Sequence, residues 1–258
     1  MARSKKTEAK QPENEYTTRS GIKVKEYYTP EDMAAGWDYN TQLGDPYEYP
    51  FTRGINPPSE RVHWRISQYF GFGSGKSTNE FLKYVLEQGT QNLVIAFDLP
   101  TQCGYDSDHP MSHGEVGKIG VAIDTLADVE NIFKDINIEG LAISPGGNNA
   151  ISPIVLAMML AFCEKNGMDP KKVKFAFQND PLKEFISRGA FIFPPKQAVK
   201  FAVDTVEYFH KNGFENAAGH LFCGYHLREG GATITQTMAF TLANAVAFID
   251  EFVGRGYK

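Results

Sequence analysis

The stretch LVIAFDLPTQ, residues 93–102, contains a short apolar run followed at once by polar residues. The run does not alternate between apolar and polar positions, which is typical of a strand buried on both faces of a parallel sheet. Three similar runs follow, at 140–144, 173–178 and 220–224. Helical patterns separate them, and we expect helices near 77–89, 124–135, 151–166, 196–212 and 233–253. The alternation predicts βα units and a parallel sheet covered by helices on both faces.

Polar side chains gather directly after each predicted strand. They are Asp98 and Gln102, Ser144 and Asn148, Gln178 and Asn179, and finally Tyr225 and His226. Both a (β/α) barrel and a doubly wound sheet bind ligands at the carboxyl ends of their strands, so this pattern favours neither fold. Four βα units are half of an eight-unit barrel, and a half-barrel has two unpaired edges. The chain is therefore expected to be either a doubly wound domain or incomplete on its own.

A glycine-rich stretch, FGFGSGKSTNE at 70–80, superficially resembles a nucleotide-binding P-loop. A P-loop has a glycine five residues before the glycine that precedes its lysine, but Phe70 occupies that position here. The preceding residues, WRISQYFGF, do not read as a buried parallel strand either. We interpret it as a turn before a helix, with Ser77 or Thr78 as the N-cap.

Composition places the chain among soluble globular proteins. The 258 residues carry a formal net charge of -5, which gives no electrostatic reason to expect nucleic acid or an anionic membrane as a partner. Three scattered cysteines and the absence of a signal-peptide pattern fit the cytoplasm. No continuous apolar run approaches the ~20 residues that span a bilayer. We expect a disordered leader at 1–20, an irregular arm with a substrate-contacting segment at 21–76, and βα units over 77–258.

Several long motifs occur in an order that is found in one family. They are YPFTRGI (49–55), QYFGFGS (68–74), AFDLPTQCGYDSDHP (96–110), GEVGKIGVAID (114–124), QNDPLKEFISRG (178–189), FIFPP (191–195) and GYHLREGGAT (224–233). With them the chain resembles the catalytic barrel of the adenosylcobalamin-dependent acyl-CoA mutases, typified by methylmalonyl-CoA mutase. The resemblance implies an α/β fold, a (β/α)8 TIM-type barrel of which this chain supplies the N-terminal half: an arm and about four βα units.

The resemblance also implies a reaction and a set of site residues. The family are isomerases that rearrange the carbon skeleton of an acyl-CoA by radical chemistry, which the vitamin B12 cofactor supplies. Matching positions imply that His226 donates to the thioester carbonyl, that Tyr69 and Arg188 bind a free acyl carboxylate, and that Gln178 hydrogen-bonds near the carbonyl. Ser144 and Asn148 match positions lining the substrate channel, while Tyr225 and Glu229 match positions near the corrin ring and the adenosyl ribose. Asp98 reads equally well as a supporting carboxylate or an N-cap. No metal ligands are expected.

The sequence departs from the family pattern in three places. The segment INPPSERVH, 55–63, lacks a stretch that helps thread the pantetheine arm, and Ser67 stands where an arginine usually grips the CoA phosphates. Gly146 replaces a common threonine, which predicts a wider pocket. The remaining barrel half and a cobalamin-binding D-x-H-x-x-G motif are not found in this sequence.

The chain is thus expected to be part of a hetero-oligomer that binds an acyl-CoA together with the other half-barrel and a cobalamin-binding domain or small subunit. The expected reaction interconverts a branched dicarboxylic acyl-CoA and its linear isomer, of the methylmalonyl-CoA/succinyl-CoA type. Two alternatives stay open: a related mutase with a different acyl group, and a non-catalytic binding or assembly subunit that retains the barrel motifs.

Overall fold

The computed structural model describes residues 16–54, 67–146 and 151–257, and the chain divides into two compact units, 1–64 and 65–258. The first unit holds little regular structure: an antiparallel pair of strands, β1 (Tyr16–Thr17) and β2 (Lys23–Val24), a 3-10 turn (Pro30–Asp32) and the short helix α1 (Tyr39–Gln42). Of the predicted leader at 1–20, residues 1–15 lie outside the described residues, and 16–20 form β1 and the start of its turn.

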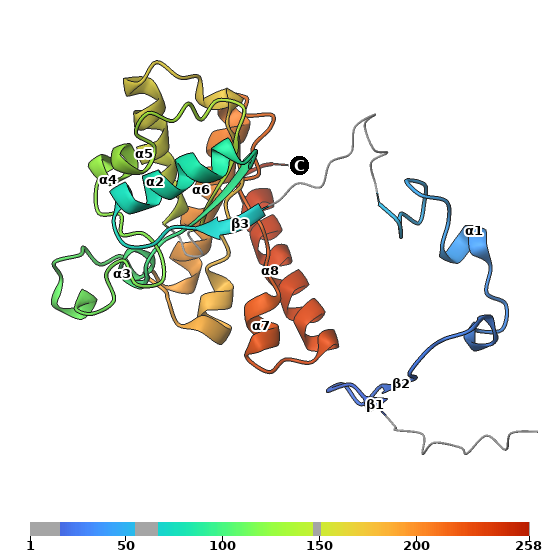
Figure 1. Cartoon of the computed structure of the whole chain (residues 1–258). Helices are drawn as coiled ribbons and strands as arrows, with labels where there is room; N and C mark the ends of the chain where they lie inside the picture. Colours follow the sequence, from blue (N-terminus) through green and yellow to red (C-terminus); the bar gives the residue numbers. More distant parts are fainter. Residues whose placement is uncertain (1–15, 55–66, 147–150, 258) are drawn as a thin grey trace, which may run out of the picture. The chain divides into compact units, whose positions relative to one another are not determined.

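The second unit is built on a parallel four-stranded sheet (Figure 1). Its strands lie side by side in chain order, β3 (Ser67–Phe70), β4 (Asn92–Ala96), β5 (Ala142–Gly146) and β6 (Lys174–Phe175). After β6, a single parallel bridge joins Ala176 to Ala218. The parallel sheet confirms the predicted α/β class.

Two strand predictions were wrong. The sheet begins at β3, inside the segment predicted as an irregular arm. The sequence did not indicate this strand because SQYF lies at the edge of the sheet, where its first three side chains are exposed and form no apolar run. The predicted strand at 220–224 is irregular, and the parallel contact at that place is the bridge at Ala218.

Helices pack on one face of the sheet. Leu93, Ile95 and Ile143 are buried on that face, whereas the alternating residues Val94 and Ser144 are half-buried. The principal helices after these strands are α2 (Gly75–Glu87), α4 (Leu126–Ile132), α5 (Ser152–Lys165), α6 (Pro195–Asn212) and α8 (Ile234–Gly254).

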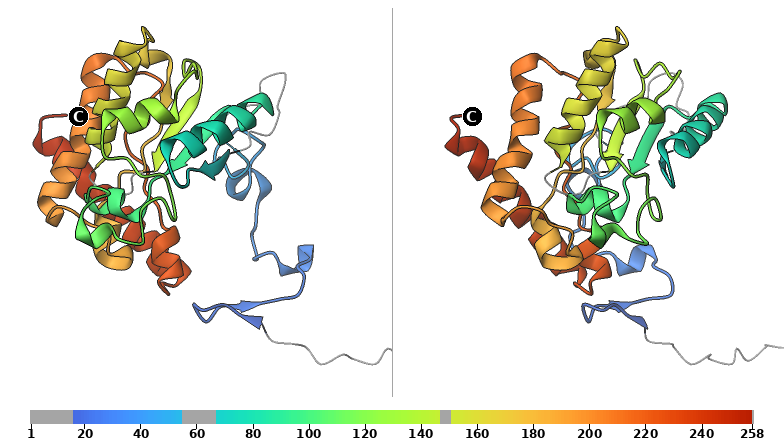
Figure 2. Two further views of the ribbon diagram at one scale, coloured as in Figure 1. Left: turned by 60° about the vertical axis from the view of Figure 1, so that its left-hand side comes forward. Right: turned by 90° about the vertical axis from the view of Figure 1, so that its left-hand side faces the viewer.

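Each of these helices packs on the next in chain order, as the views in Figure 2 show. The prediction of helices on both faces was therefore wrong. A sheet with consecutive helices on one face is a section of a (β/α) barrel, whereas a doubly wound sheet places helices on both.

The GSGKS stretch begins α2. Ser74 is the N-cap and forms a reciprocal capping box with Ser77, so the predicted N-cap at Ser77 or Thr78 was three or four residues late. Gly75 is required by packing, since a Cβ there would lie 3.0 Å from the Cβ of Asn131 on α4. Lys76 points to solvent. The glycines and serines of this stretch therefore start and seat a helix.

Helix α8 is long and mostly uncovered. By length and composition alone it qualifies as a membrane span, and 11% of its most apolar stretch is buried. Sequence analysis found no apolar run of this length because threonine, glutamine and asparagine interrupt the apolar residues of α8. One side chain of α8, Asn244, donates to both carboxylate oxygens of buried Asp180, at 3.2 and 3.3 Å. The helix is therefore anchored to the barrel section along one side.

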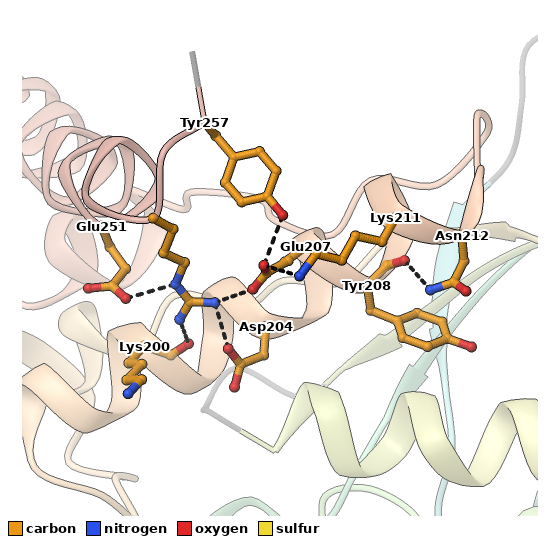
Figure 3. A network of polar contacts seen from close by, with 9 residues as sticks. Lys200, Asp204, Glu207, Tyr208, Lys211, Asn212, Glu251 and Tyr257 are labelled. Atoms are coloured by element: carbon orange, nitrogen blue, oxygen red, sulfur yellow. Dashed lines mark hydrogen bonds and ion pairs between the residues drawn. The ribbon is translucent and has the colours of Figure 1, made fainter.

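A polar network fastens the end of α8 to α6 (Figure 3). The guanidinium of Arg255 lies among four acceptors: Asp204 at 2.7 Å, Glu207 at 2.6 Å, Glu251 at 2.9 Å and the carbonyl of Lys200 at 2.7 Å. Hydrogen bonds from Lys211, Tyr257 and Arg255 lower the pKa of Glu207 to about 2. Glu207 and Arg255 therefore both stay charged at neutral pH.

Asp98 is the N-cap of α3 (Leu99–Cys103), and it is fully buried. One carboxylate oxygen accepts from the backbone N–H of Thr101 at 3.0 Å, and the other accepts from Gly117 at 2.7 Å. The carboxylate therefore joins the turn after β4 to the long loop that precedes α4. The N-cap interpretation is confirmed.

Replacing Asp98 tests this link. Asp98→Ala should lower the free energy of unfolding by about 2–4 kcal/mol, the sum of a lost N-cap and a lost charge-assisted hydrogen bond. Asp98→Asn should cost less because one oxygen remains to accept from Thr101. Urea denaturation followed by circular dichroism measures both. Equal losses for the two variants would contradict the assignment of separate roles to the two oxygens.

Candidate active site

The less buried face of the sheet carries the first predicted site residues. Strand register places Tyr69 beside Val94, and Val94 beside Ser144, in one row across β3, β4 and β5. Tyr69 is 69% exposed. The hydroxyl of Ser144 donates to the carbonyl of Ala176 at 2.6 Å, so in this structure it ties β5 to the end of β6. On this face of the sheet, the Tyr69 phenol is therefore accessible to a ligand.

Arg188 lies at the carboxyl end of the sheet, in a turn that follows β6. Residues Glu184–Arg188 form a π-helical turn, closed by a bond from the N–H of Gly189 to the carbonyl of Glu184 at 2.7 Å. The side chain of Arg188 is 23% exposed. Its Nη1 donates to Glu184 Oε1 at 3.3 Å and its Nη2 donates to Gln102 Oε1 at 2.5 Å. Segments after β4 and β6 therefore meet at one guanidinium.

The segment that carries Arg188 also contains three fully buried charged residues: Asp180, Lys183 and Glu184. Burial raises the pKa of Asp180 and of Glu184, and it lowers the pKa of Lys183. Nearby opposite charges oppose each shift. Sequence analysis quoted these residues within the motif QNDPLKEFISRG but did not single them out. The available signal was the presence of four charged residues in a segment directly after an apolar strand.

His226 lies in α7 (Tyr225–Glu229), which packs on the π-helical turn. A Cβ added at Gly230 would be 3.6 Å from the Cβ of Ser187. Burial, together with the positive charges of Lys183 and Arg188, lowers the pKa of His226 to about 4. Its Nδ1 is buried and has no hydrogen-bond partner among the described residues. At neutral pH the ring is therefore an uncharged imidazole.

The other predicted residues are distributed around the same end of the sheet. Tyr225 is 64% exposed and Glu229 is exposed, both on α7. Gln178 is half-buried just after β6. Asn148 and the segment 55–63 lie outside the described residues. Within the described part of the chain, no group of three or more His, Cys, Asp or Glu side chains is placed to hold a metal ion.

Gly146 lies where sequence analysis predicted a wider pocket. A Cβ at this position would lie 2.4 Å from the carbonyl oxygen of Ile95. The neighbouring strand therefore occupies the space of a side chain, and the glycine reflects close backbone approach.

Polar and aromatic side chains at the carboxyl end of a parallel sheet, with helices on the sheet's other face, are the arrangement in which (β/α) barrels bind their ligands. The family profile described as methylmalonyl-CoA mutase matches residues 17–258. The chain belongs to this family of acyl-CoA mutases.

Individual relatives agree with the family assignment. The chain is 39% identical over 255 residues to the 2-hydroxyisobutanoyl-CoA mutase large subunit of Aquincola tertiaricarbonis, covering 96% of this chain and 44% of that one. It is 37% identical to the methylmalonyl-CoA mutase of Cereibacter sphaeroides (98% of this chain, 35% of that one) and 37% identical to the human mitochondrial methylmalonyl-CoA mutase (97% and 34%). The chain thus spans between a third and a half of the length of these relatives.

The charge state of His226 is directly measurable. In an NMR titration its ring should stay neutral down to a pH of about 4. Arg188→Gln should raise its pKa, because one of the two positive charges that disfavour protonation is removed. Arg255→Gln, which removes a positive charge at the far end of α8, is the matched control and should leave it unchanged. A His226 ring that protonates near pH 6.5, the ordinary value for histidine, would contradict the buried, cationic environment.

Proposed function

We propose that this chain supplies part of the catalytic barrel of a carbon-skeleton mutase. The proposed reaction interconverts a branched dicarboxylic acyl-CoA and its linear isomer, of the methylmalonyl-CoA/succinyl-CoA type, with adenosylcobalamin as the cofactor. The observation that carries the proposal is Arg188, a half-buried guanidinium held by two side chains at the ligand end of the sheet. A guanidinium can bind a carboxylate through two hydrogen bonds, and the phenol of Tyr69 adds a further donor.

His226 suits the role of a donor to the thioester carbonyl. A neutral imidazole can donate one hydrogen bond without introducing a charge, and burial together with the positive charges nearby keeps it neutral. The group therefore polarises the carbonyl while its own proton stays in place. Gln178, on the segment between β6 and the π-helical turn, can add an amide donor. In the assembled enzyme, His226→Ala should therefore lower turnover far more than it lowers substrate affinity.

The residues available for the cofactor fit an adenosylcobalamin face. Tyr225 exposes an aromatic ring and Glu229 exposes a carboxylate on the same short helix, one able to pack on a corrin and the other able to accept from ribose hydroxyls. When bound, this cofactor supplies a carbon radical by homolysis of its cobalt–carbon bond. The protein residues bind and orient the acyl group and exclude water.

A mutase with another acyl group is the second candidate. It is favoured by the 39% identity to a relative named 2-hydroxyisobutanoyl-CoA mutase large subunit. That candidate has no need of a guanidinium for a free acyl carboxylate, so Arg188 distinguishes the two candidates.

We further propose that a complementary barrel half covers α8. Five exposed apolar side chains, spaced three or four residues apart, form a stripe along this helix: Met238, Leu242, Val246, Ile249 and Val253, each between 54% and 62% exposed. Within the described barrel section every earlier principal helix packs on a following one, whereas α8 packs on α6 and on the short helix α7, which both precede it. The stripe has the helical spacing of a packing surface and matches the next helix of a barrel. This surface is also the observation that favours a non-catalytic assembly subunit.

Carboxylate recognition can be tested by calorimetry with succinyl-CoA and with butyryl-CoA, which has a methyl group in place of the carboxylate. Arg188→Gln should weaken succinyl-CoA binding about ten- to a hundredfold, the range expected for losing a charge-assisted pair, and should leave butyryl-CoA binding unchanged. Arg228→Gln, on α7, is the matched control and should bind both esters as the wild type does. Equal weakening for the two esters would favour the second candidate.

The α8 surface can be tested by co-expression with the C-terminal part of the Cereibacter sphaeroides relative. The two pieces should co-purify, and Leu242→Glu with Val246→Glu should abolish the complex because charges cannot be buried in an apolar interface. Ile119→Glu is the control: it places a charge at a 56% exposed loop position and should leave the complex intact. Flotation of the chain with lipid vesicles, without complex formation, would show instead that a membrane covers α8.

A further inference from the structure

Glu184 is a fully buried carboxylate with one partnered oxygen. Its Oε1 accepts from Arg188, and its Oε2 has no hydrogen-bond partner among the described residues. It is four residues from Arg188 in the π-helical turn, so its position relative to the guanidinium is set by local backbone structure. An unpartnered buried oxygen is costly and therefore calls for an explanation.

The groups facing Glu184 come from several elements. Lys183 and Arg188 lie on its own segment, the backbone N–H of Ala190 favours its ionised form, and Cys103 of α3 lies close enough to interact electrostatically. Lys183 in turn interacts with Asp180 on the same segment and with Cys223, His220 and His226 on later segments. Asp180, Lys183, Glu184 and Arg188 carry two formal charges of each sign, so the cluster is balanced when empty.

A carboxylate that binds to Arg188 upsets this balance. The guanidinium would then face two carboxylates, and the buried cluster would carry one excess negative charge. Two carboxylates close together in a buried site do not both stay ionised; one proton is taken up and shared between them. Burial raises the pKa of both Asp180 and Glu184, but Glu184 is the carboxylate that accepts from Arg188, whereas Asp180 accepts from Asn244. Glu184 is therefore the group placed to accept that proton.

We propose that Glu184 is a proton-accepting positioning residue: it holds Arg188 in the empty site and becomes protonated when an acyl carboxylate docks on the same guanidinium. The proposal rests on the carboxylate-binding role given to Arg188 above. Protonation frees the guanidinium for the ligand and turns Oε2 or Oε1 into a hydroxyl donor toward the arriving carboxylate. Gln102, bonded to the other nitrogen of Arg188, holds the group in place throughout the exchange.

The sign of the pH dependence follows from this exchange. Because the ligand-bound state holds one more proton than the empty state, affinity for a dicarboxylic acyl-CoA rises as the pH falls from the bound-state pKa of Glu184 toward its lower empty-state pKa. The limiting slope is about tenfold in the dissociation constant per pH unit for one proton. A monocarboxylic acyl-CoA brings no carboxylate to the cluster and should show no such slope.

Proton uptake can be counted by calorimetry in buffers that differ in ionisation enthalpy. The wild-type chain, or its complex with the complementary half, should take up close to one proton with succinyl-CoA and none with butyryl-CoA. Glu184→Gln should bind succinyl-CoA without proton uptake and without the pH slope. Glu251→Gln is the matched control, since it removes the acid of another Glu–Arg pair four residues apart, and it should behave as the wild type. Uptake that persists in Glu184→Gln would overturn the proposal, as would its absence in the wild type.

A ligand-free measurement separates this proposal from the proposed function. If neither ester binds, the carboxylate-binding function fails, and the Glu184–Arg188 pairing is decided by a carbon NMR titration of the Glu184 carboxyl. Arg188→Gln should raise the Glu184 pKa markedly, because the guanidinium is the largest interaction that favours its ionised form. An unchanged pKa in that variant would show that the two groups are not coupled and would end the proposal.

Discussion

The guanidinium of Arg188 joins parts of the chain that are 86 residues apart, since it donates to Gln102 after β4 and to Glu184 after β6. The parallel sheet makes this possible, because it brings the carboxyl ends of its strands to one edge. The close pairing of β4 and β5 leaves no space for a side chain at Gly146. The site therefore depends on strand spacing first and on the buried charges of the π-helical turn second.

The sequence predicts the class of fold well because the runs at β4, β5 and β6 are apolar and the intervening helices are long. It fails at β3, where the exposed residues of an edge strand give no apolar signal, and at 220–224, where an apolar run meets its neighbour at one bridge. Predicting helices on both faces was also wrong, because an apolar strand looks alike in a curved and in a flat sheet. The position of each helix relative to the sheet is a property of the whole chain.

Motifs in the sequence named the candidate site residues, but the arrangement of their side chains could not be predicted from those motifs. Arg188 and His226 were indicated by motifs, yet nothing in the local sequence shows that burial, helped by a buried lysine and the guanidinium, keeps the imidazole neutral. The burial of Glu184 could not be predicted either, because a glutamate inside KEFISR has the pattern of a solvent-exposed helical residue. In the structure it lies fully buried in the π-helical turn, near α3. Asp98 shows the reverse case, since its position before LPTQ predicted the N-cap that the structure contains.

The uncovered stripe on α8 also has a consequence for how cells make this protein. Exposed apolar helices of this length promote aggregation and attract chaperones and proteases until they are covered. With the proposed complementary half covering α8, the amount of chain that accumulates would follow the supply of that half, and chain in excess of it would be degraded.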